Sequence, residues 1–200
     1  MDRPDLIATL RAASHAEGPC SSDFDLNPDI QLPEGRQLRE AAVLIPVIQR
    51  GGQTEVILTK RSSALKHHPG QIAFPGGKRD AGDPSLVDTA LREAEEEIGL
   101  ARGNVEILGA LPTHETVTSF TVTPVLGLVR DDFDPVPEVS EVAEVFSVPL
   151  AHICDPARFQ VQSRRWRGHR RHYYVVPYGP YYIWGATARM LRSLADRLAP

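Results

Sequence analysis

The clearest periodic pattern in the chain covers residues 86–98, where apolar side chains recur every three or four positions. These apolar positions are Leu86, Val87, Ala90, Leu91, Ala94 and Ile98. The spacing places them on one face and predicts an α-helix over 86–98 that packs against a core. Asp83 and Ser85 are candidate N-caps, Pro84 suits the first helical position, and Gly99 suits a left-handed helix end.

Other apolar runs predict a framework of strands and helices. A hairpin is predicted over 41–49 and 55–59, and further strands over 104–111, 117–129 and 145–150. A short buried strand from residue 71 is predicted to end in a Pro-Gly-Gly turn. Amphipathic patterns predict helices over 4–15 and 186–198, and alternating flanks predict a hairpin around 163–172. Loops are predicted over the polar or proline-containing segments 17–37, 62–70, 113–120 and 131–138.

Composition narrows the class of protein. With 200 residues, 42% of them hydrophobic and 24% charged, the chain has the size and make-up of one globular domain. A net charge of -4 argues against a surface that coats nucleic acid. The longest apolar run, 41–48, is too short to cross a bilayer, and Cys20 and Cys154 show neither disulfide-framework nor zinc-ligand spacing. We therefore expect a cytoplasmic enzyme with no nucleic-acid or membrane partner; whether it forms a homodimer is left open.

The polar face of the predicted 86–98 helix carries an excess of acid. Glu93 and Glu97 are four residues apart on one side, and Glu96 crowds the same turn. Like charges at that spacing repel by roughly a few tenths of a kcal/mol, and acids near a helix C-terminus also oppose the helix dipole. One interpretation is a solvated acidic face. The other is a site for Mg2+ or Mn2+, because hard oxygen ligands would turn the repulsion into ligation.

Two glycines upstream of the helix extend this pattern. The stretch 71–78 reads QIAFPGGK, in which Gly76 and Gly77 permit a close approach that a side chain would block. A resemblance to the Nudix hydrolase box, a glycine and a spaced acid before Arg-Glu-x-x-Glu-Glu-x-Gly, is carried by Gly77, Arg92-Glu93, Glu96-Glu97 and Gly99. The spaced acid is Asp83 where the box has Glu, and one extra residue separates it from Arg92. The brace for Arg92 is therefore assigned to either Asp80 or Asp83.

The stretch 58–77 is more specific. It reads LTKRSSALKHHPGQIAFPGG and resembles the signature of the coenzyme A pyrophosphatase branch of the Nudix family: Leu-Thr-x-Arg-Ser, a basic residue, then Gly and Phe-Pro-Gly-Gly. Lys66 stands where that branch usually has Arg, which keeps the charge but loses bidentate recognition of phosphate. The extra residue in the box is also usual for the branch, and the resemblance extends weakly over residues 40–195.

The resemblance implies a fold and a reaction. The expected fold class is α/β, the Nudix α/β/α sandwich with a mixed β-sheet, over 38–200, preceded by an N-terminal helix and irregular connector over 1–37. The implied reaction is hydrolysis, dependent on Mg2+ or Mn2+, of the diphosphate bond of coenzyme A or its derivatives to 3′,5′-ADP and 4′-phosphopantetheine or its acyl form. Two alternatives stay open: hydrolysis of another nucleoside diphosphate derivative such as ADP-ribose, and a non-catalytic nucleotide-binding Nudix protein.

The resemblance also divides the candidate residues by role. Glu93 and Glu97 are the implied metal ligands, with Glu96 third; Glu96 or Glu141 is the implied base, and Arg92 orients the glutamates. The implied substrate-binding residues are Arg61, Lys66, His68, Gly76 and Gly77. His114 or Glu115 either lines the site or belongs to an exposed turn.

The segment 163–172, SRRWRGHRRH, contains five arginines, two histidines and a tryptophan in ten residues. Three interpretations are open. It is a soluble hairpin tip, a nucleic-acid patch, or a recognition element for an anionic nucleotide such as the 3′-phosphate and adenine of coenzyme A.

Overall fold

The computed structural model describes residues 2–32, 35–166 and 168–199. Nine strands form one mixed sheet with the central order β1-β7-β8-β2-β3-β4; β5 pairs with β2, β6 with β8 and β9 with β3. These strands are β1 (Ser21–Ser22), β2 (Arg39–Arg50), β3 (Gln53–Arg61), β4 (Ile72–Ala73), β5 (Gly76–Lys78), β6 (Val105–Ala110), β7 (His114–Glu115), β8 (Phe120–Val129) and β9 (Val142–Pro149). A separate hairpin is formed by β10 (Gln160–Trp166) and β11 (His169–Val175). The helices are α1 (Arg3–His15), α2 (Leu86–Ile98), α3 (Leu150–Ile153) and α4 (Gly185–Leu198), with 3-10 turns at Arg102–Asn104 and Pro156–Arg158.

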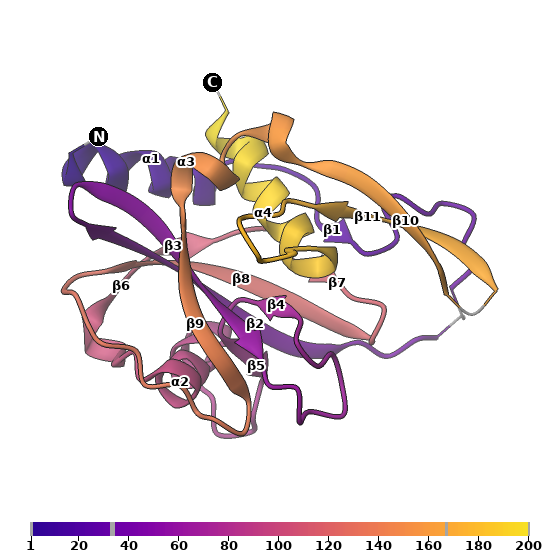
Figure 1. Cartoon of the computed structure of the whole chain (residues 1–200), viewed down its shortest axis with the longest axis horizontal. Coiled ribbons are helices and arrows are strands. Elements are labelled where there is room, and N and C mark those ends of the chain that lie inside the picture. The colour runs from indigo at the N-terminus through magenta and orange to yellow at the C-terminus, as the bar shows by residue number, and fades with distance from the viewer. Residues whose placement is uncertain (1, 33–34, 167, 200) are drawn as a thin grey trace.

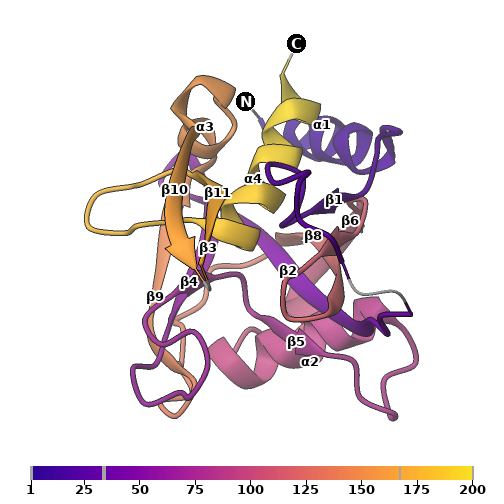
Figure 2. The same ribbon diagram turned by 90° about the vertical axis from the view of Figure 1, so that its right-hand side faces the viewer.

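Helices cover both faces of the large sheet (Figure 1). The face under α2 has its own core, which includes Ala90, Ala94 and Ile98 of the helix and Leu44 of β2. The opposite face carries α1 and α4, whose apolar residues join a larger core, and Figure 2 shows these helices across the sheet from α2. β2 runs parallel to β8 and antiparallel to β3. The predicted α/β/α sandwich with a mixed sheet is therefore confirmed.

The acidic helix α2 forms where the apolar period predicts it. Ser85 is the N-cap, and its side chain accepts a hydrogen bond from the Asp88 backbone N–H at 3.2 Å. Gly99 ends the helix in the left-handed conformation at φ 70°. Of the two candidate caps, Ser85 takes the role, which leaves the Asp83 carboxylate available for a side-chain partner.

The glycine turn is more elaborate than predicted. The single strand expected from residue 71 is divided into β4, which pairs with β3, and β5, which crosses to pair with β2. Gly76 lies at the crossing, and an added Cβ there would come within 2.5 Å of the Ala42 carbonyl oxygen and 2.6 Å of Val43 Cα. Only glycine fits this approach of two backbones, so the crossing fixes the position of the turn under α2.

Several shorter elements differ from the predictions. The predicted loops 17–37 and 113–120 contain β1 and β7, which pair in parallel. The strand predicted over 145–150 begins at Val142 and leads into α3. The N-terminal helix packs Leu6 and Leu10 into the core that α4 shares. Within the described residues, no helix is long and apolar enough to cross a membrane.

Candidate active site

Glu97 is the most deeply placed of the predicted metal ligands. It lies on the buried face of α2 and is 4% exposed. Its Oε2 accepts a hydrogen bond from the Gly76 backbone N–H at 3.1 Å. Burial, together with the nearby Glu93 and Glu141 carboxylates, raises the pKa of Glu97 to about 8, against the lowering effect of the Gly76 hydrogen bond and the Arg61 charge. A carboxylate in this position is held by the glycine turn but is poorly solvated when ionised.

Glu93 lies one turn before Glu97 and contacts the same glycine turn. A Cβ added to Gly77 would overlap the Glu93 carboxylate, so the backbone at this position lies directly against the acid. Burial raises the pKa of Glu93, with smaller contributions from Glu96 and Glu141, although the Arg92 charge opposes the shift. Gly76 and Gly77 therefore each contact one of the two glutamates, and their substrate-binding role stays a prediction.

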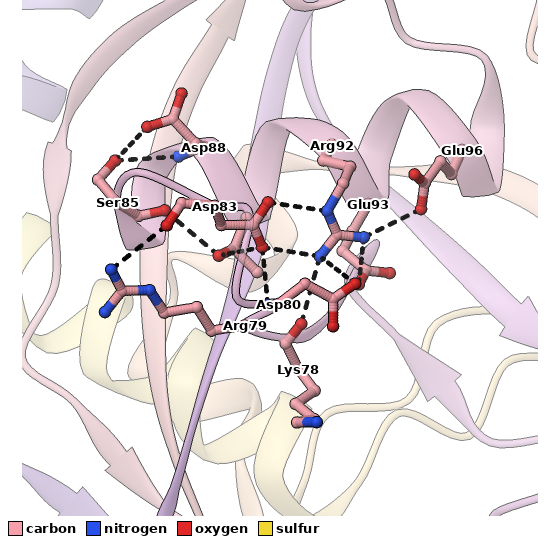
Figure 3. A network of polar contacts seen from close by, with 10 residues as sticks. Lys78, Arg79, Asp80, Asp83, Ser85, Asp88, Arg92, Glu93 and Glu96 are labelled. Atoms are coloured by element: carbon pink, nitrogen blue, oxygen red, sulfur yellow. Dashed lines mark hydrogen bonds and ion pairs between the residues drawn. The ribbon is translucent and has the colours of Figure 1, made fainter.

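Asp83 provides the brace for Arg92 (Figure 3). Arg92 donates from Nε to Asp83 Oδ1 and from Nη2 to Asp83 Oδ2, both at 2.9 Å. The Asp80 carboxylate lies 3.9 Å from Arg92 Nη2 and is the more distant of the two candidates. The hydrogen bonds from Arg92 and from the Asp80 backbone hold the pKa of Asp83 well below its usual range. The bidentate geometry therefore resolves the alternative between Asp80 and Asp83.

The other end of the Arg92 side chain orients two acids of α2. Arg92 Nη1 donates to Glu93 Oε1 at 2.9 Å and to Glu96 Oε2 at 3.0 Å. The Asp83 bonds raise the pKa of Arg92 further above its usual range, and its side chain is only 17% exposed. Glu96 is 60% exposed at its side chain and lies at the rim, unlike buried Glu97. The expected orienting role of Arg92 is consistent with this geometry.

Arg61, at the end of β3, and Glu141, in the turn directly before β9, reach the same site. Arg61 ends β3 at a register shift and pairs with Val142, and the Ser62 N–H donates to the Glu141 carbonyl oxygen at 2.8 Å. The charge of Arg61 lowers the pKa of Glu97, and the charge of Glu141 raises it. Arg61 Nε is buried and lacks a hydrogen-bond partner in the described part of the chain. A guanidinium in this state is suited to an anionic ligand.

Two further predicted residues lie outside this cluster. Lys66 and His68 belong to the exposed loop between β3 and β4, and the interactions found among the described residues do not join either side chain to Glu93 or Glu97. His68 has a φ of 55°, and its carbonyl oxygen accepts a hydrogen bond from the Gln71 N–H at 3.3 Å. Their substrate-binding role stays a prediction.

His114 is neither an exposed turn residue nor part of the acidic cluster. It is fully buried, with Nδ1 2.9 Å from Ser21 Oγ and Nε2 3.2 Å from Asp23 Oδ1. These contacts connect β7 to the N-terminal segment. Glu115 forms an ion pair with Arg36. Because the partners of His114 are about 90 residues away along the chain, no local sequence signal marks this arrangement.

A cleft of about 410 Å³ opens beside the Arg92 network. It is lined by Arg39, Glu40, Lys78, Arg79, Asp80 and Ala81. Arg92 Nη2 donates to the Lys78 carbonyl oxygen at 3.3 Å, so the network forms part of the cleft's surroundings. The Lys78 side chain points away from the carboxylates in Figure 3.

The acidic site fits a hard divalent cation by its donor chemistry. Glu93 and Glu97 are carboxylates whose pKa values are raised by burial, and Glu141 adds a further negative charge nearby. A cation of the Mg2+ or Mn2+ type prefers such oxygen donors and would relieve their repulsion. Across the described residues, no group of three His, Cys, Asp or Glu side chains already forms a metal-ligating cluster. Glu93 and Glu97 are thus the residues that best fit the cation, with Arg92 holding Glu93 in place.

The fold and site define an α/β/α sandwich in which an acidic helix packs against a glycine turn. The model of the NUDIX domain matches residues 38–170, and the chain belongs to the Nudix family. Hydrolases of this family act on nucleoside diphosphate derivatives and generally use divalent ions such as Mg2+ or Mn2+. The exposed charged rim of the site is compatible with such anionic small molecules.

Two relatives are both described as uncharacterized Nudix hydrolase NudL. The protein from Enterobacter sp. (strain 638) is 44% identical over 157 residues, covering 78% of this chain and 81% of the relative. The protein from Pectobacterium atrosepticum is 39% identical over 182 residues, covering 89% and 94%. The NUDIX domain of Shewanella oneidensis NrtR has the same fold, with a TM-score of 0.53, 15% identity and coverage of 100% of both chains.

Proposed function

We propose that this chain hydrolyses the diphosphate bond of coenzyme A or its derivatives, giving 3′,5′-ADP and 4′-phosphopantetheine or its acyl form. One observation carries the proposal: the positive charge of Arg61, which belongs to the upstream stretch 58–77, lowers the pKa of the buried Glu97 carboxylate. The residues that suggest the substrate and the residues that suggest the chemistry thus belong to one site. A cluster of acids alone would support only a metal-dependent reaction on some diphosphate.

The roles of the side chains follow from their surroundings. Glu93 and Glu97 would hold Mg2+ or Mn2+, which when bound neutralises phosphate charge and makes water a better nucleophile. Arg92 keeps Glu93 oriented, and Asp83 keeps Arg92 oriented. Arg61 binds a phosphate oxygen through a guanidinium that is already partly desolvated.

A base is also needed to take a proton from the attacking water. Glu141 is exposed, acts electrostatically on both Glu93 and Glu97, and lies where water has access. Glu96 is exposed too, but its carboxylate is engaged by Arg92 at 3.0 Å. We therefore assign the base to Glu141 in preference to Glu96.

The substrate assignment rests on the upstream stretch. Lys66 and His68 belong to the same resemblance as Arg61, and the exposed loop that carries them leaves both side chains accessible to a ligand. We assign to them contacts with the phosphates of coenzyme A.

The test is a hydrolysis assay with coenzyme A and ADP-ribose in parallel, each with Mg2+ or Mn2+. Glu97→Gln is the loss variant, and Glu95→Gln is the matched control, because Glu95 is an exposed acid of the same helix. We expect turnover of coenzyme A by the wild type and Glu95→Gln and its loss in Glu97→Gln. Turnover of ADP-ribose alone would reject the substrate while keeping the chemistry. Absence of metal-dependent turnover of either compound by folded protein would reject the proposal.

A further inference from the structure

The β10–β11 hairpin concentrates positive charge on a short segment of the chain. Arg164 lies directly opposite Arg171 and Arg165 opposite Arg170, so two successive cross-strand pairs bring like charges together. Nine arginines elsewhere form ion pairs with carboxylates; these are Arg11, Arg36, Arg50, Arg79, Arg92, Arg102, Arg158, Arg189 and Arg192. Among the described residues, Arg164, Arg165 and Arg170 form no such pair. Arg167, a fifth member of the predicted cluster, lies outside the described residues.

One face of the hairpin combines this charge with aromatic rings. The Arg164 guanidinium lies over the Trp184 ring at 4.3 Å from its centroid. Tyr173 meets Trp184 edge to face at 5.2 Å, and the Tyr182 hydroxyl donates to Gln162 Oε1 at 2.7 Å. Stacking uses the flat surface of a guanidinium and leaves its N–H edge available for bidentate binding of phosphate.

The two faces of the hairpin are different environments. In a hairpin, directly opposite residues point to the same face and successive residues point to alternate faces. Arg164 and Tyr173 therefore point to one face of the hairpin, and Arg165 and Arg170 point to the other. Trp184, over which Arg164 stacks, therefore belongs to the Arg164 face. This alternation supplies a matched control, because Arg165 is an exposed arginine of the same strand on the other face.

A continuous path joins this face to the acidic site. Trp184 immediately precedes Gly185, and a Cβ added to Gly185 would lie 3.7 Å from Gln71 Nε2. The Gln71 carbonyl oxygen accepts the Arg61 N–H at 2.9 Å, and Arg61 acts on Glu97. The backbone that follows Trp184 thus adjoins Gln71, which is hydrogen-bonded to the backbone of Arg61.

We propose that the Arg164–Trp184 face of the hairpin binds a phosphate monoester on the nucleotide half of the substrate, separate from the diphosphate that is cleaved. This inference rests on the proposed function, because coenzyme A carries such a group, the 3′-phosphate. Two N–H groups of the Arg164 guanidinium bind the phosphate oxygens, and stacking on the Trp184 ring fixes the orientation of the guanidinium. The site selects nucleotides that bear this extra phosphate over those that lack it.

A nucleic-acid duplex suits the surface less well. Acids outnumber Lys and Arg in the whole chain even though five of the arginines lie in this one segment, so the remainder of the protein repels a long polyanion. A single phosphate monoester contacts only the Arg164–Trp184 face and is not exposed to this repulsion.

The inference is tested by calorimetric titration of the full chain with 3′,5′-ADP and with 5′-ADP, which lacks the 3′-phosphate. The wild type should bind 3′,5′-ADP about tenfold more tightly, the scale of one charged hydrogen-bonding contact. Arg164→Gln should remove this preference, Arg164→Lys should retain only part of it, and Arg165→Gln should keep it. Equal affinities in the wild type, or the same preference in Arg164→Gln, would overturn the inference.

Hydrolysis provides a second readout that separates this inference from the proposed function. Arg164→Gln should raise the KM for coenzyme A about tenfold and leave that for dephospho-coenzyme A unchanged. A wild type that discriminates 3′,5′-ADP but hydrolyses neither compound would reject the proposed function and keep the binding face. Salt-sensitive duplex binding that Arg164→Gln abolishes, without discrimination between the two nucleotides, would assign the face to nucleic acid and overturn the inference.

Discussion

Replacing Glu97 with glutamine should stabilise the metal-free protein as the pH rises, although it should abolish activity. Glutamine has nearly the same shape and keeps an oxygen that can accept the Gly76 N–H. The substitution removes a carboxylate that is 4% exposed and surrounded by Glu93 and Glu141. The variant therefore separates the electrostatic cost of this side chain from its packing.

The magnitude follows from the pKa of Glu97, which is about 8 in the folded chain and 4.5 in its ordinary environment. Between these values the folded state retains a proton that the unfolded state has lost, so wild-type stability falls as pH rises through this window. Each unit of pKa difference corresponds to about 1.4 kcal/mol, and the whole window to about 5 kcal/mol. The glutamine side chain of the variant does not titrate, so the advantage of Glu97→Gln should grow over the same interval and level off above about pH 8.

The assay is urea unfolding in the presence of EDTA at pH values from about 5 to about 9, which span the window set by the raised pKa. Glu95→Gln is the control, because Glu95 is exposed and pairs with Arg102 at the surface, where such pairs contribute at most about 1 kcal/mol. The free energy of unfolding of Glu95→Gln should differ from that of the wild type by no more than this amount at every pH. A stability difference between Glu97→Gln and the wild type that stays constant over the whole pH range would refute the assignment of a raised pKa to Glu97. Added Mg2+ should stabilise the wild type and not the variant.

Three further substitutions probe the supports of the site. Gly77→Ala should displace the Glu93 carboxylate that a Cβ would overlap, and steady-state kinetics should show a fall in kcat of about a hundredfold with α2 retained by circular dichroism. Asp83→Asn should lower Tm at neutral pH, because it removes the carboxylate that pairs with Arg92. Arg92 depresses the Asp83 pKa, so the wild type should lose stability as pH falls below about 4, and the variant should lack this loss. If the pairing were unimportant, Tm would fall with acid at the same slope in both proteins. Glu141→Gln should lower kcat by about 10²- to 10⁴-fold with little change in KM, and an unchanged kcat would exclude it as the base.

The sequence predicted the acidic helix closely because two local signals agree. The apolar period sets the buried face, and Ser85 and Gly99 mark the ends that the structure shows. The division of the 71–78 stretch into two strands was not predictable in this way. It arises because β5 leaves β4 and pairs with β2, a choice made by distant backbone partners rather than by the stretch itself.

Side-chain partners were less accessible to sequence reasoning than the helix. Asp80 and Asp83 lie in the same short loop, and only the folded path shows that Asp83 meets Arg92 with both oxygens. The resemblance alone points to Glu141, and its electrostatic effect on Glu97 depends on the pairing of β3 with β9. The polar stretch 113–120 predicts a loop at His114, and its burial is not foreseeable because its partners in the N-terminal segment are far away in the sequence.

The glycines and the glutamates together form a unit that packing alone does not favour. Two acids four residues apart and close to a helix C-terminus repel each other, and burial raises the pKa of both. Gly77 brings the backbone against Glu93 and Gly76 donates its N–H to Glu97, so the turn retains the acids instead of excluding them. An apolar residue at position 97 would fill the same buried place without that electrostatic penalty. The penalty is best explained by a positively charged ligand, because a bound cation converts the same repulsion into coordination and gives the buried acids a function.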